Sequence, residues 1–285
     1  MNRKIAELIT NRIVAELEQG IIPWHKPWTG TSSGPISHVT GRPYSLINQL
    51  VLGRPGEYIT YNQCIAEGGK VKKGAKSLPV IFWKQNKFVE KDEETGEEVE
   101  RIVPILRYYT VFHIDDCENI KAKYQTEEVK PAEPIKEAEK IVRRYKRVNP
   151  SIRIHNDKLS NEAFYRPSTD EIVVPSLGQY ENKEEYYSTL FHEMTHSTGH
   201  PSRLNRIDKC AAFGSKDYSK EELVAEIGAA SLVNIAGIET DKSFRNSAAY
   251  IQSWMKALKN DPTMLITASG KAEKAVEYIL RTKKA

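Results

Sequence analysis

Cysteine is scarce in this chain of 285 residues: its three cysteines, Cys64, Cys117 and Cys210, lie far apart and form no CxxC pair. This excludes a disulfide scaffold and a zinc finger built on thiolates, and it suits a reducing compartment. Long apolar runs are also missing, so we expect no helix that spans a membrane, which takes roughly 18 consecutive apolar residues. Charged side chains interrupt positions 1–20, where a signal peptide would need an unbroken apolar stretch. We therefore expect a cytoplasmic protein with no membrane partner.

The chain also lacks a strong charge of one sign, with 42 Lys and Arg against 38 Asp and Glu and a net charge of +4. That total is too small to indicate a nucleic-acid-binding protein. The distribution is uneven, however, because residues 1–89 carry 12 basic and 5 acidic side chains, whereas residues 90–100 carry one basic and seven acidic ones. The acidic stretch therefore hides a basic first segment. An apolar share of 39% is enough for a globular protein with one or two domains.

The first half of the chain predicts both helices and strands. Apolar residues recur every four positions over 5–17, which indicates an amphipathic helix with Gly20 as its end. A second helix is expected over 45–52. Thr60 with Gln63 forms a capping box for a short third helix, which the glycines at 68 and 69 end.

Two segments rich in β-branched and aromatic residues, 79–89 and 101–114, lie on either side of the acidic stretch. They predict an antiparallel β-hairpin with a solvated tip. Residues 115–134 then turn polar and contain two prolines, which marks a domain boundary. We expect one domain over 1–125 and a second over 135–285.

The second half of the chain predicts short strands among longer helices. Asn182 with Glu185, and Ser219 with Glu222, have the spacing of residues that cap helix N-termini. Strands and helices do not alternate regularly, so the fold class is predicted as α+β rather than a doubly wound sheet. The expected strands are 151–155, 164–166 and 171–175, and the expected helices are about 135–147, 182–197, 219–235, 247–259 and 271–282.

The strongest chemical signal is the motif His192-Glu193-Met194-Thr195-His196. On a helix, residues four apart share a face, so His192 and His196 can present two imidazoles to one cation. Glu193 lies about 100° round the helix, where it can act as the base that takes a proton from an attacking water. Zn²⁺ lowers the pKa of bound water to about 7. The motif therefore predicts a zinc hydrolase site, against the alternative of two incidental histidines on a solvated helix.

A third ligand is expected from outside this helix, with Glu222, Glu226, His200 and Asp208 as candidates. His200 comes two residues too early for the longer zinc motif that ends in a third histidine. Glu222 has a simpler explanation as a capping residue. Glu226 lies among small residues that imply close helix packing, and a buried carboxylate needs a partner such as a cation. We therefore predict Glu226 as the metal ligand; if Glu222 binds the metal instead, Glu226 would accept a hydrogen bond from a ligand imidazole.

Other residues could complete a peptidase site. Tyr218, Arg203 and Tyr187 are candidates for the donor that stabilises a developing oxyanion. The strand at 171–175 could be an edge strand that binds an extended peptide. Each of these residues has an ordinary structural role as its alternative.

Cations and aromatic rings are interleaved in the basic first segment, which is what binding to a single nucleic-acid strand requires. The alternative is a set of core aromatics beside a solubilising lysine loop. The candidate DNA-binding residues are Trp24, Lys26, Trp28, Arg42, Tyr44, Tyr61, Lys70, Lys72, Lys73, Lys76 and Trp83.

Several stretches carry a resemblance to a known family. In the first half they are IIPWHKPW, TGRPYSLINQLVL, ITYNQCIAEGGKVKKGAKSLPVIFWK and RYYTVFHIDDC; in the second they are FYRPSTDEIVVPS, EEYYSTLFHEMTHSTGHPSRLNR, FGSKDYSKEELVAEIGAA and YIQSWMKALKND. With these stretches in order over nearly its whole length, the chain resembles the ArdC-type antirestriction proteins of plasmids and mobile elements. Their first domain is similar to the N-terminal part of TraC-type plasmid primases.

The resemblance implies a first domain that binds single-stranded DNA, a second domain that is a zincin-like metallopeptidase, and a role in shielding incoming DNA from host restriction. Carried over to this chain, it implies His192 and His196 as zinc ligands, Glu193 as base, and a Glu of EELVAE as third ligand. Ser219 stands where the family would lead us to expect Ala. A protein substrate, such as a host restriction or DNA-processing component, is a hypothesis from the site. The competing hypothesis is a DNA-coating protein whose zinc is only structural.

Overall fold

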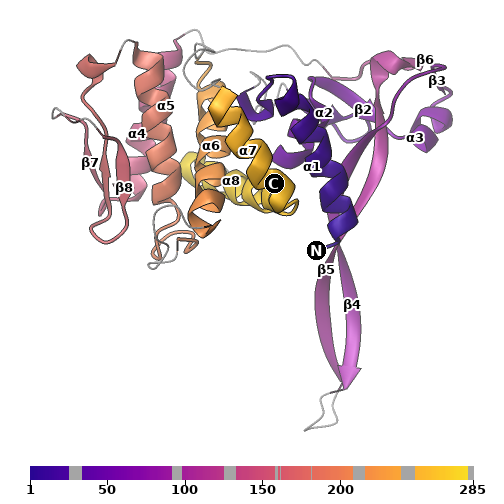
Figure 1. Cartoon of the computed structure of the whole chain (residues 1–285). Helices are drawn as coiled ribbons and strands as arrows, with labels where there is room; N and C mark the ends of the chain where they lie inside the picture. Colours follow the sequence, from indigo (N-terminus) through magenta and orange to yellow (C-terminus); the bar gives the residue numbers. More distant parts are fainter. Residues whose placement is uncertain are drawn as a thin grey trace.

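The computed structural model of the chain describes residues 1–25, 34–91, 98–124, 133–157, 160, 162–180, 182–207, 216–238 and 248–281. It is a mixed α+β structure, as predicted. Figure 1 shows a small sheet and its helices at one end, a group of long helices in the middle, and at the other end a second sheet with a protruding hairpin. Among the described helices, none combines the length and the apolar character needed to cross a bilayer.

The N-terminal helices follow the predicted pattern closely. Helix α1 (Arg3–Glu18) buries one apolar face and is followed by Gly20, whose φ of +78° favours glycine. Helix α2 (Leu46–Leu52) is buried over its whole length. Helix α3 (Tyr61–Ala66) begins with the predicted capping box: Thr60 Oγ1 accepts a bond from the Gln63 amide (3.3 Å), and Gln63 Oε1 accepts one from the Thr60 amide (3.0 Å).

The predicted hairpin is confirmed as two long antiparallel strands. Its register runs from Leu78 opposite Val111 to Lys91 opposite Glu98. The hairpin extends far beyond the sheet to which its base belongs (Figure 1). That sheet has the order β1-β2-β5-β4, and a separate pair joins β3 to β6. The strands are β1 (Pro35–Ser37), β2 (Gly56–Ile59), β3 (Lys70–Val71), β4 (Leu78–Lys91), β5 (Glu98–His113) and β6 (Cys117–Glu118), with 3₁₀ turns η1 (Pro23–His25) and η2 (Ile114–Asp116).

The second half begins with helix α4 (Pro134–Val148) and a small three-stranded sheet. Strand β9 (Glu171–Val173) pairs with β7 (Arg153–His155) on one side and with β8 (Phe164–Arg166) on the other. The prediction of an edge strand at 171–175 is therefore wrong, because β9 is central and both of its edges are paired. After the 3₁₀ turn η3 (Leu177–Gln179), helix α5 (Lys183–Ser197) begins at the predicted cap, where Asn182 Oδ1 accepts a bond from the Glu185 amide (2.8 Å).

Three further helices complete the fold: α6 (Lys216–Ile235), α7 (Ala248–Asn260) and α8 (Met264–Leu280). Helix α6 begins three residues before Ser219, so the predicted capping box at Ser219 and Glu222 is wrong, and both residues lie within the helix. Helix α8 begins at Met264 rather than near residue 271, because Met264, Leu265 and Ile266 are buried in the core and extend the helix.

One hydrophobic core joins the two halves of the chain. It contains side chains of α1, α2 and the hairpin base together with side chains of α6, α7 and α8. The Trp24 ring meets the Trp254 ring edge-on, with 6.2 Å between centroids, and Thr10 Oγ1 donates to the Pro262 carbonyl (2.7 Å). Trp24 is fully buried. Its prediction as a DNA-stacking residue is therefore wrong, because its ring contributes to this core and cannot reach a base.

Candidate metal centre

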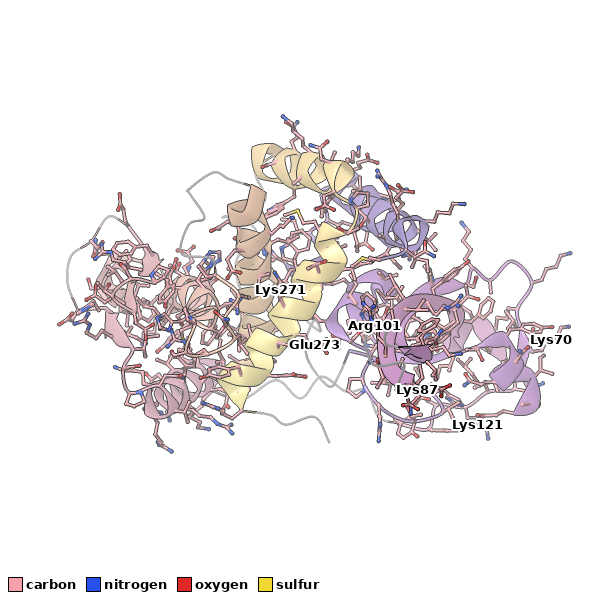
Figure 2. The ribbon with its side chains drawn as sticks, turned by 90° about the horizontal axis from the view of Figure 1, so that it is seen from below. Lys70, Lys87, Arg101, Lys121, Lys271 and Glu273 are labelled. Carbon is pink, nitrogen blue, oxygen red and sulfur yellow. The ribbon has the colours of Figure 1, made fainter. Side chains whose placement is uncertain are left out.

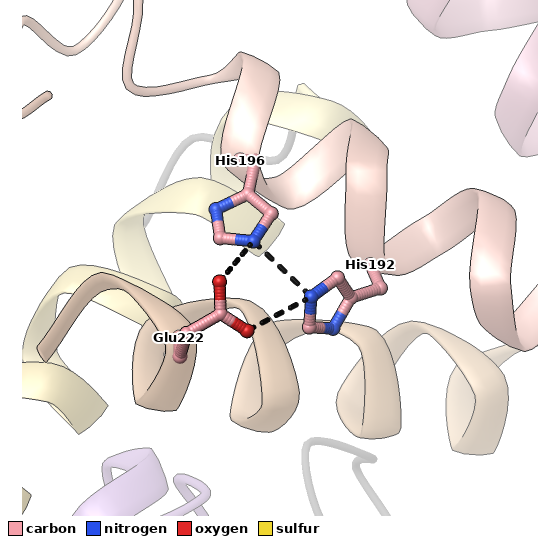
Figure 3. Close-up of side chains that lie close together, drawn as sticks. All are labelled: His192, His196 and Glu222. Atoms are coloured by element: carbon pink, nitrogen blue, oxygen red, sulfur yellow. Dashed lines mark hydrogen bonds and ion pairs between the residues drawn. The ribbon is translucent and has the colours of Figure 1, made fainter. Parts of the chain in front are cut away.

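The two histidines of the motif meet a glutamate of a neighbouring helix. His192 and His196 lie on one face of α5, with their Nε2 atoms 3.1 Å apart. Glu222 of α6 places Oε1 3.3 Å from Nε2 of His196 and Oε2 3.5 Å from Nε2 of His192. The ligand atoms of all three residues lie within 4.8 Å of one another (Figure 3).

The chemistry of this group fits a divalent cation. The Nε2 atoms of the two imidazoles lie 3.1 Å apart, and their lone pairs would repel each other unless a proton or a cation lies between them. Two histidines and one glutamate form a donor set of catalytic zinc sites, in which water or substrate takes the fourth position. The side chains of His192, His196 and Glu222 are mostly buried, which strengthens their electrostatic interaction with an ion.

The group that could hold a cation contains Glu222 and not Glu226, which was the predicted ligand. Glu226 lies one helical turn further along α6, with Oε1 3.7 Å from Nδ1 of His192. That nitrogen is the ring atom opposite to the one that faces His196. Because α6 starts at Lys216, Glu222 is not needed as a cap and is available to the metal. At 3.7 Å Glu226 is beyond hydrogen-bond distance of Nδ1 of His192, so the alternative interpretation, in which Glu226 accepts a bond from a ligand imidazole, stays a prediction.

A buried network supports His196 from behind. Its Nδ1 lies 3.3 Å from Oε1 of Glu221, and both Glu221 oxygens accept bonds from Arg206 (2.9 and 3.0 Å). Arg206 also donates to Thr198 Oγ1 and to the Thr195 carbonyl (2.6 and 2.5 Å). The network thereby ties the end of α5 to the start of α6. Glu221 and Arg206 both lie in stretches that carry the family resemblance, the first in EELVAE and the second at the end of HPSRLNR, but no spacing rule predicted this role for either of them.

The electrostatics of the site follow from its burial and its acidic partners. Burial opposes protonation of His196, but the hydrogen bonds with Glu221 and Glu222 outweigh it and raise the pKa of His196 to about 10. Burial likewise opposes ionisation of Glu222, but the two imidazoles hold the pKa of that carboxyl well below its usual value. The group is therefore strongly attractive to positive charge.

Glu193 is buried beside this group, next to His192 on α5. Its charge adds to the forces that raise the pKa of His196. It also acts on Tyr180, just before α5, whose pKa is raised first by burial and then by the charges of Tyr186, Glu193 and Glu185, against an opposing hydrogen bond with Thr189. Tyr180 therefore lies within the electrostatic reach of Glu193, although no sequence pattern pointed to it.

The predicted oxyanion donors have other partners. The Arg203 guanidinium is buried and bonds to Asp170, to the Tyr165 hydroxyl (3.1 Å) and to the Ser197 carbonyl (2.6 Å). The Tyr187 hydroxyl lies against Glu139 (3.5 Å). These contacts favour the alternative for both residues, an ordinary structural role. The Tyr218 side chain and Asp208 lie outside the described residues, and His200 Nδ1 bonds to Ser202 Oγ (2.7 Å) rather than joining the metal ligands.

Most of the predicted DNA-binding residues in the described part of the chain are accessible. Tyr44 is half-buried, and Lys72 donates its Nζ to the Asp115 carbonyl (2.7 Å). Lys26 and Trp28 lie outside the described residues. The exposed members are Arg42, Tyr61, Lys70, Lys72, Lys73, Lys76 and Trp83.

Two family models match successive parts of the chain: the N-terminal domain of the anti-restriction factor ArdC over residues 3–112, and a zincin-like metallopeptidase over residues 137–271. The chain is 36% identical over 296 residues to a DNA primase TraC of Escherichia coli. The matched region covers 96% of this chain and 27% of the primase. The chain thus spans about a quarter of that relative's length.

Two relatives match over nearly their full length. The uncharacterized protein y4eC of Sinorhizobium fredii is 31% identical over 290 residues, covering 96% of this chain and 91% of that protein. The Mn(II)-bound crystal structure of the antirestriction protein ArdC from plasmid R388 matches with a TM-score of 0.73 and 32% identity, covering 97% of each chain. Taken with the two family models, this similarity shows that the chain belongs to the ArdC-type antirestriction family.

Proposed function

We propose that this protein holds single-stranded DNA with its N-terminal part and hydrolyses a peptide bond of a protein substrate at a zinc site in its C-terminal part. In this way it would protect incoming mobile-element DNA in the cytoplasm of a new host. The observation that carries the proposal is the convergence of His192, His196 and Glu222 beside the buried carboxylate of Glu193.

The metal is proposed as Zn²⁺ held by His192, His196 and Glu222. A related structure contains Mn(II), but imidazole nitrogens with one carboxylate are a donor set that zinc favours. When bound, such an ion lowers the pKa of a coordinated water and polarises a carbonyl. Elemental analysis of the purified protein should give about one zinc per chain, and His196→Ala should lose it.

The chain's own residues supply the remaining chemistry. Glu193 accepts the proton of the attacking water and then passes it to the leaving amine of the cleaved peptide bond. Glu221 forms a hydrogen bond with the second nitrogen of His196 and so holds that ring in the orientation that directs Nε2 to the ion. Glu226 faces the second nitrogen of His192 at 3.7 Å, beyond hydrogen-bond distance, and acts on that ring through its charge. These roles need no movement of either helix.

The DNA-binding part of the proposal rests on charge and exposure. The exposed residues Arg42, Tyr61, Lys70, Lys72, Lys73, Lys76 and Trp83 combine phosphate-binding cations with rings on which bases can stack. We expect the logarithm of affinity for a single strand to fall with the logarithm of salt concentration, by roughly 0.7 per phosphate contact. Lys26 and Trp28 remain part of the proposed surface.

The shared core indicates which protein substrates to test. Because α1 and α2 pack directly on α6, α7 and α8, the two halves are held at a fixed relation. A protein bound to the same DNA would then be presented to the metal site at high effective concentration. A restriction or DNA-processing component of the host meets that condition.

Glu193→Gln tests whether catalysis is the mechanism. This variant keeps the side-chain volume and leaves His192, His196 and Glu222 unchanged. We expect unaltered metal content and melting temperature, together with loss of both protein cleavage and protection of unmodified DNA entering a restricting host. Full protection by this variant would instead establish the alternative, a DNA-coating protein with a structural metal.

A further inference from the structure

One face of the hairpin gathers aromatic rings and cations. Neighbouring residues of a strand point to opposite faces, and cross-strand partners share a face. Phe82 pairs with Arg107 and Phe88 pairs with Arg101, so these four side chains lie on one face. The same alternation adds Lys84, Asn86, Val103, Ile105 and Tyr109 to this face, and the aromatic and basic members are the ones used below. We define the basic–aromatic face as Phe82, Lys84, Phe88, Arg101, Arg107 and Tyr109.

The aromatic rings of this face are accessible to solvent. Phe82, Phe88 and Tyr109 are 41%, 43% and 40% exposed. Phe82 and Tyr109 lie side by side, with ring centroids 5.6 Å apart and planes tilted by 56°. Large exposed apolar groups that gather on one surface mark a binding site.

The charge of this face is of one sign. Over the paired stretch 78–88 with 101–111, its positions hold the cations Lys84, Arg101 and Arg107 and no acidic residue. The opposite face also exposes two rings, Trp83 (47%) and Tyr108 (49%). It differs in charge, because its cation Lys87 forms an ion pair with Glu100 (3.0 Å). In Figure 2, which is seen from below, Lys87 and Arg101 are labelled over the half of the molecule that also carries Lys70 and Lys121.

The shape of the face suits one strand of nucleic acid. From Phe82 to Phe88 it extends about 20 Å at the usual rise per residue, but it is only two strands wide. In the sequence the acidic stretch 90–100 directly follows Phe88 and Val89, and its charge disfavours a polyanion beyond these residues. At its base Tyr109 lies near Tyr44, since burial and then the neighbouring Tyr109 raise the pKa of Tyr44.

We propose that the basic–aromatic face binds single-stranded DNA, with its rings stacked on bases and its cations on phosphates. The inference rests on the proposed function and extends it to a surface outside the residues that sequence reasoning selected. Of those residues Tyr44 adjoins this face, whereas Trp83 lies on the opposite face of β4, so the inference assigns the DNA strand to the face of Phe82 rather than to that of Trp83. A single strand is the ligand because its unpaired bases can stack on protein rings, whereas a duplex keeps its bases stacked on one another. Figure 1 shows the hairpin projecting from the body of the protein, where a strand can reach it.

The test measures fluorescence anisotropy of a labelled oligo-dT with the full chain, between about 50 and about 300 mM salt. Phe82→Ala and Phe88→Ala should each weaken binding about 5- to 150-fold, the range for one stacked base. The triple variant Lys84→Gln, Arg101→Gln, Arg107→Gln should reduce the slope of log affinity against log salt by about 2. The matched controls Lys87→Gln and the pair Val89→Ala, Ile102→Ala lie on the opposite face and should leave both quantities unchanged.

The outcomes separate the inference from the function on which it rests. If the wild type binds oligo-dT with a salt-dependent affinity but the variants of the basic–aromatic face behave as the controls do, the site lies elsewhere and the inference is overturned alone. Equal competition by duplex DNA overturns the choice of a single strand. If the wild type does not bind oligo-dT at all, the proposed function fails as well. Since every substituted side chain is exposed, all variants should fold as the wild type does and give the same circular dichroism spectrum.

Discussion

The third metal ligand gives the sharpest prediction. Glu222 places both carboxylate oxygens within 3.5 Å of the Nε2 atoms of the two histidines, whereas Glu226 approaches Nδ1 of His192 at 3.7 Å. A residue that only supports a ligand imidazole usually changes metal affinity by about 10- to 100-fold, and loss of a ligand should cost more. Glu222→Ala and Glu226→Ala are therefore matched truncations, one turn apart on α6, with different expected effects.

The size of the effect follows from mass action. With metal at about 100 times the dissociation constant, binding stabilises the wild type by about 2.7 kcal/mol. In a chain of this size, that corresponds to a melting temperature about 5–10 °C above that of the metal-free protein. At the same metal concentration, a Glu226→Ala protein that binds the metal 10- to 100-fold more weakly is stabilised by about 1.4 to 0.4 kcal/mol. Metal should stabilise the Glu222→Ala protein by less than about 0.4 kcal/mol.

The assay is thermal unfolding of each variant with and without added Zn²⁺, together with the metal content of the purified protein. Each variant is compared with its own metal-free form, so any loss of stability from the truncation itself cancels. A Glu222→Ala protein that keeps its zinc and its thermal shift, beside a Glu226→Ala protein that loses both, would refute the geometric reasoning.

Two further predictions concern the support of the site. Gly228→Ala on α6 would place a Cβ 2.6 Å from the Thr195 methyl group of α5, so we expect a loss of about 1–3 kcal/mol in the free energy of unfolding and weaker metal binding. In the control Gly270→Ala the added Cβ meets open space, so stability and metal binding should not change. Asp170→Asn should cost about 3–5 kcal/mol in denaturant unfolding at neutral pH, because it leaves the buried Arg203 guanidinium without its carboxylate. Burial opposes ionisation of Asp170, but its bonds with Arg203 lower its pKa below the unfolded value, so this stabilisation is present above about pH 4 and lost as the pH falls further. A gap between wild type and Asp170→Asn that stays constant down to acid pH would contradict this assignment.

Local sequence patterns predicted the parts of the site that depend on nearby residues. The spacing of His192 and His196 determines a shared helix face, and Asn182 with Glu185 determines where that helix begins. The alternating segments on either side of the acidic stretch predict the hairpin, because a strand's period needs only its own residues.

Tertiary packing decided what these patterns left open. Whether Glu222 or Glu226 reaches the histidines depends on where α6 starts and how it is rotated against α5, and both depend on contacts between segments far apart in the chain. Trp24 and Phe82 are both aromatic residues of the basic first segment, yet one is sealed under Trp254 and the other is exposed. Composition cannot distinguish them, because burial is a property of the neighbours that folding brings together. The side chains that the hairpin presents on one face likewise became a surface only when the register of its two strands was known.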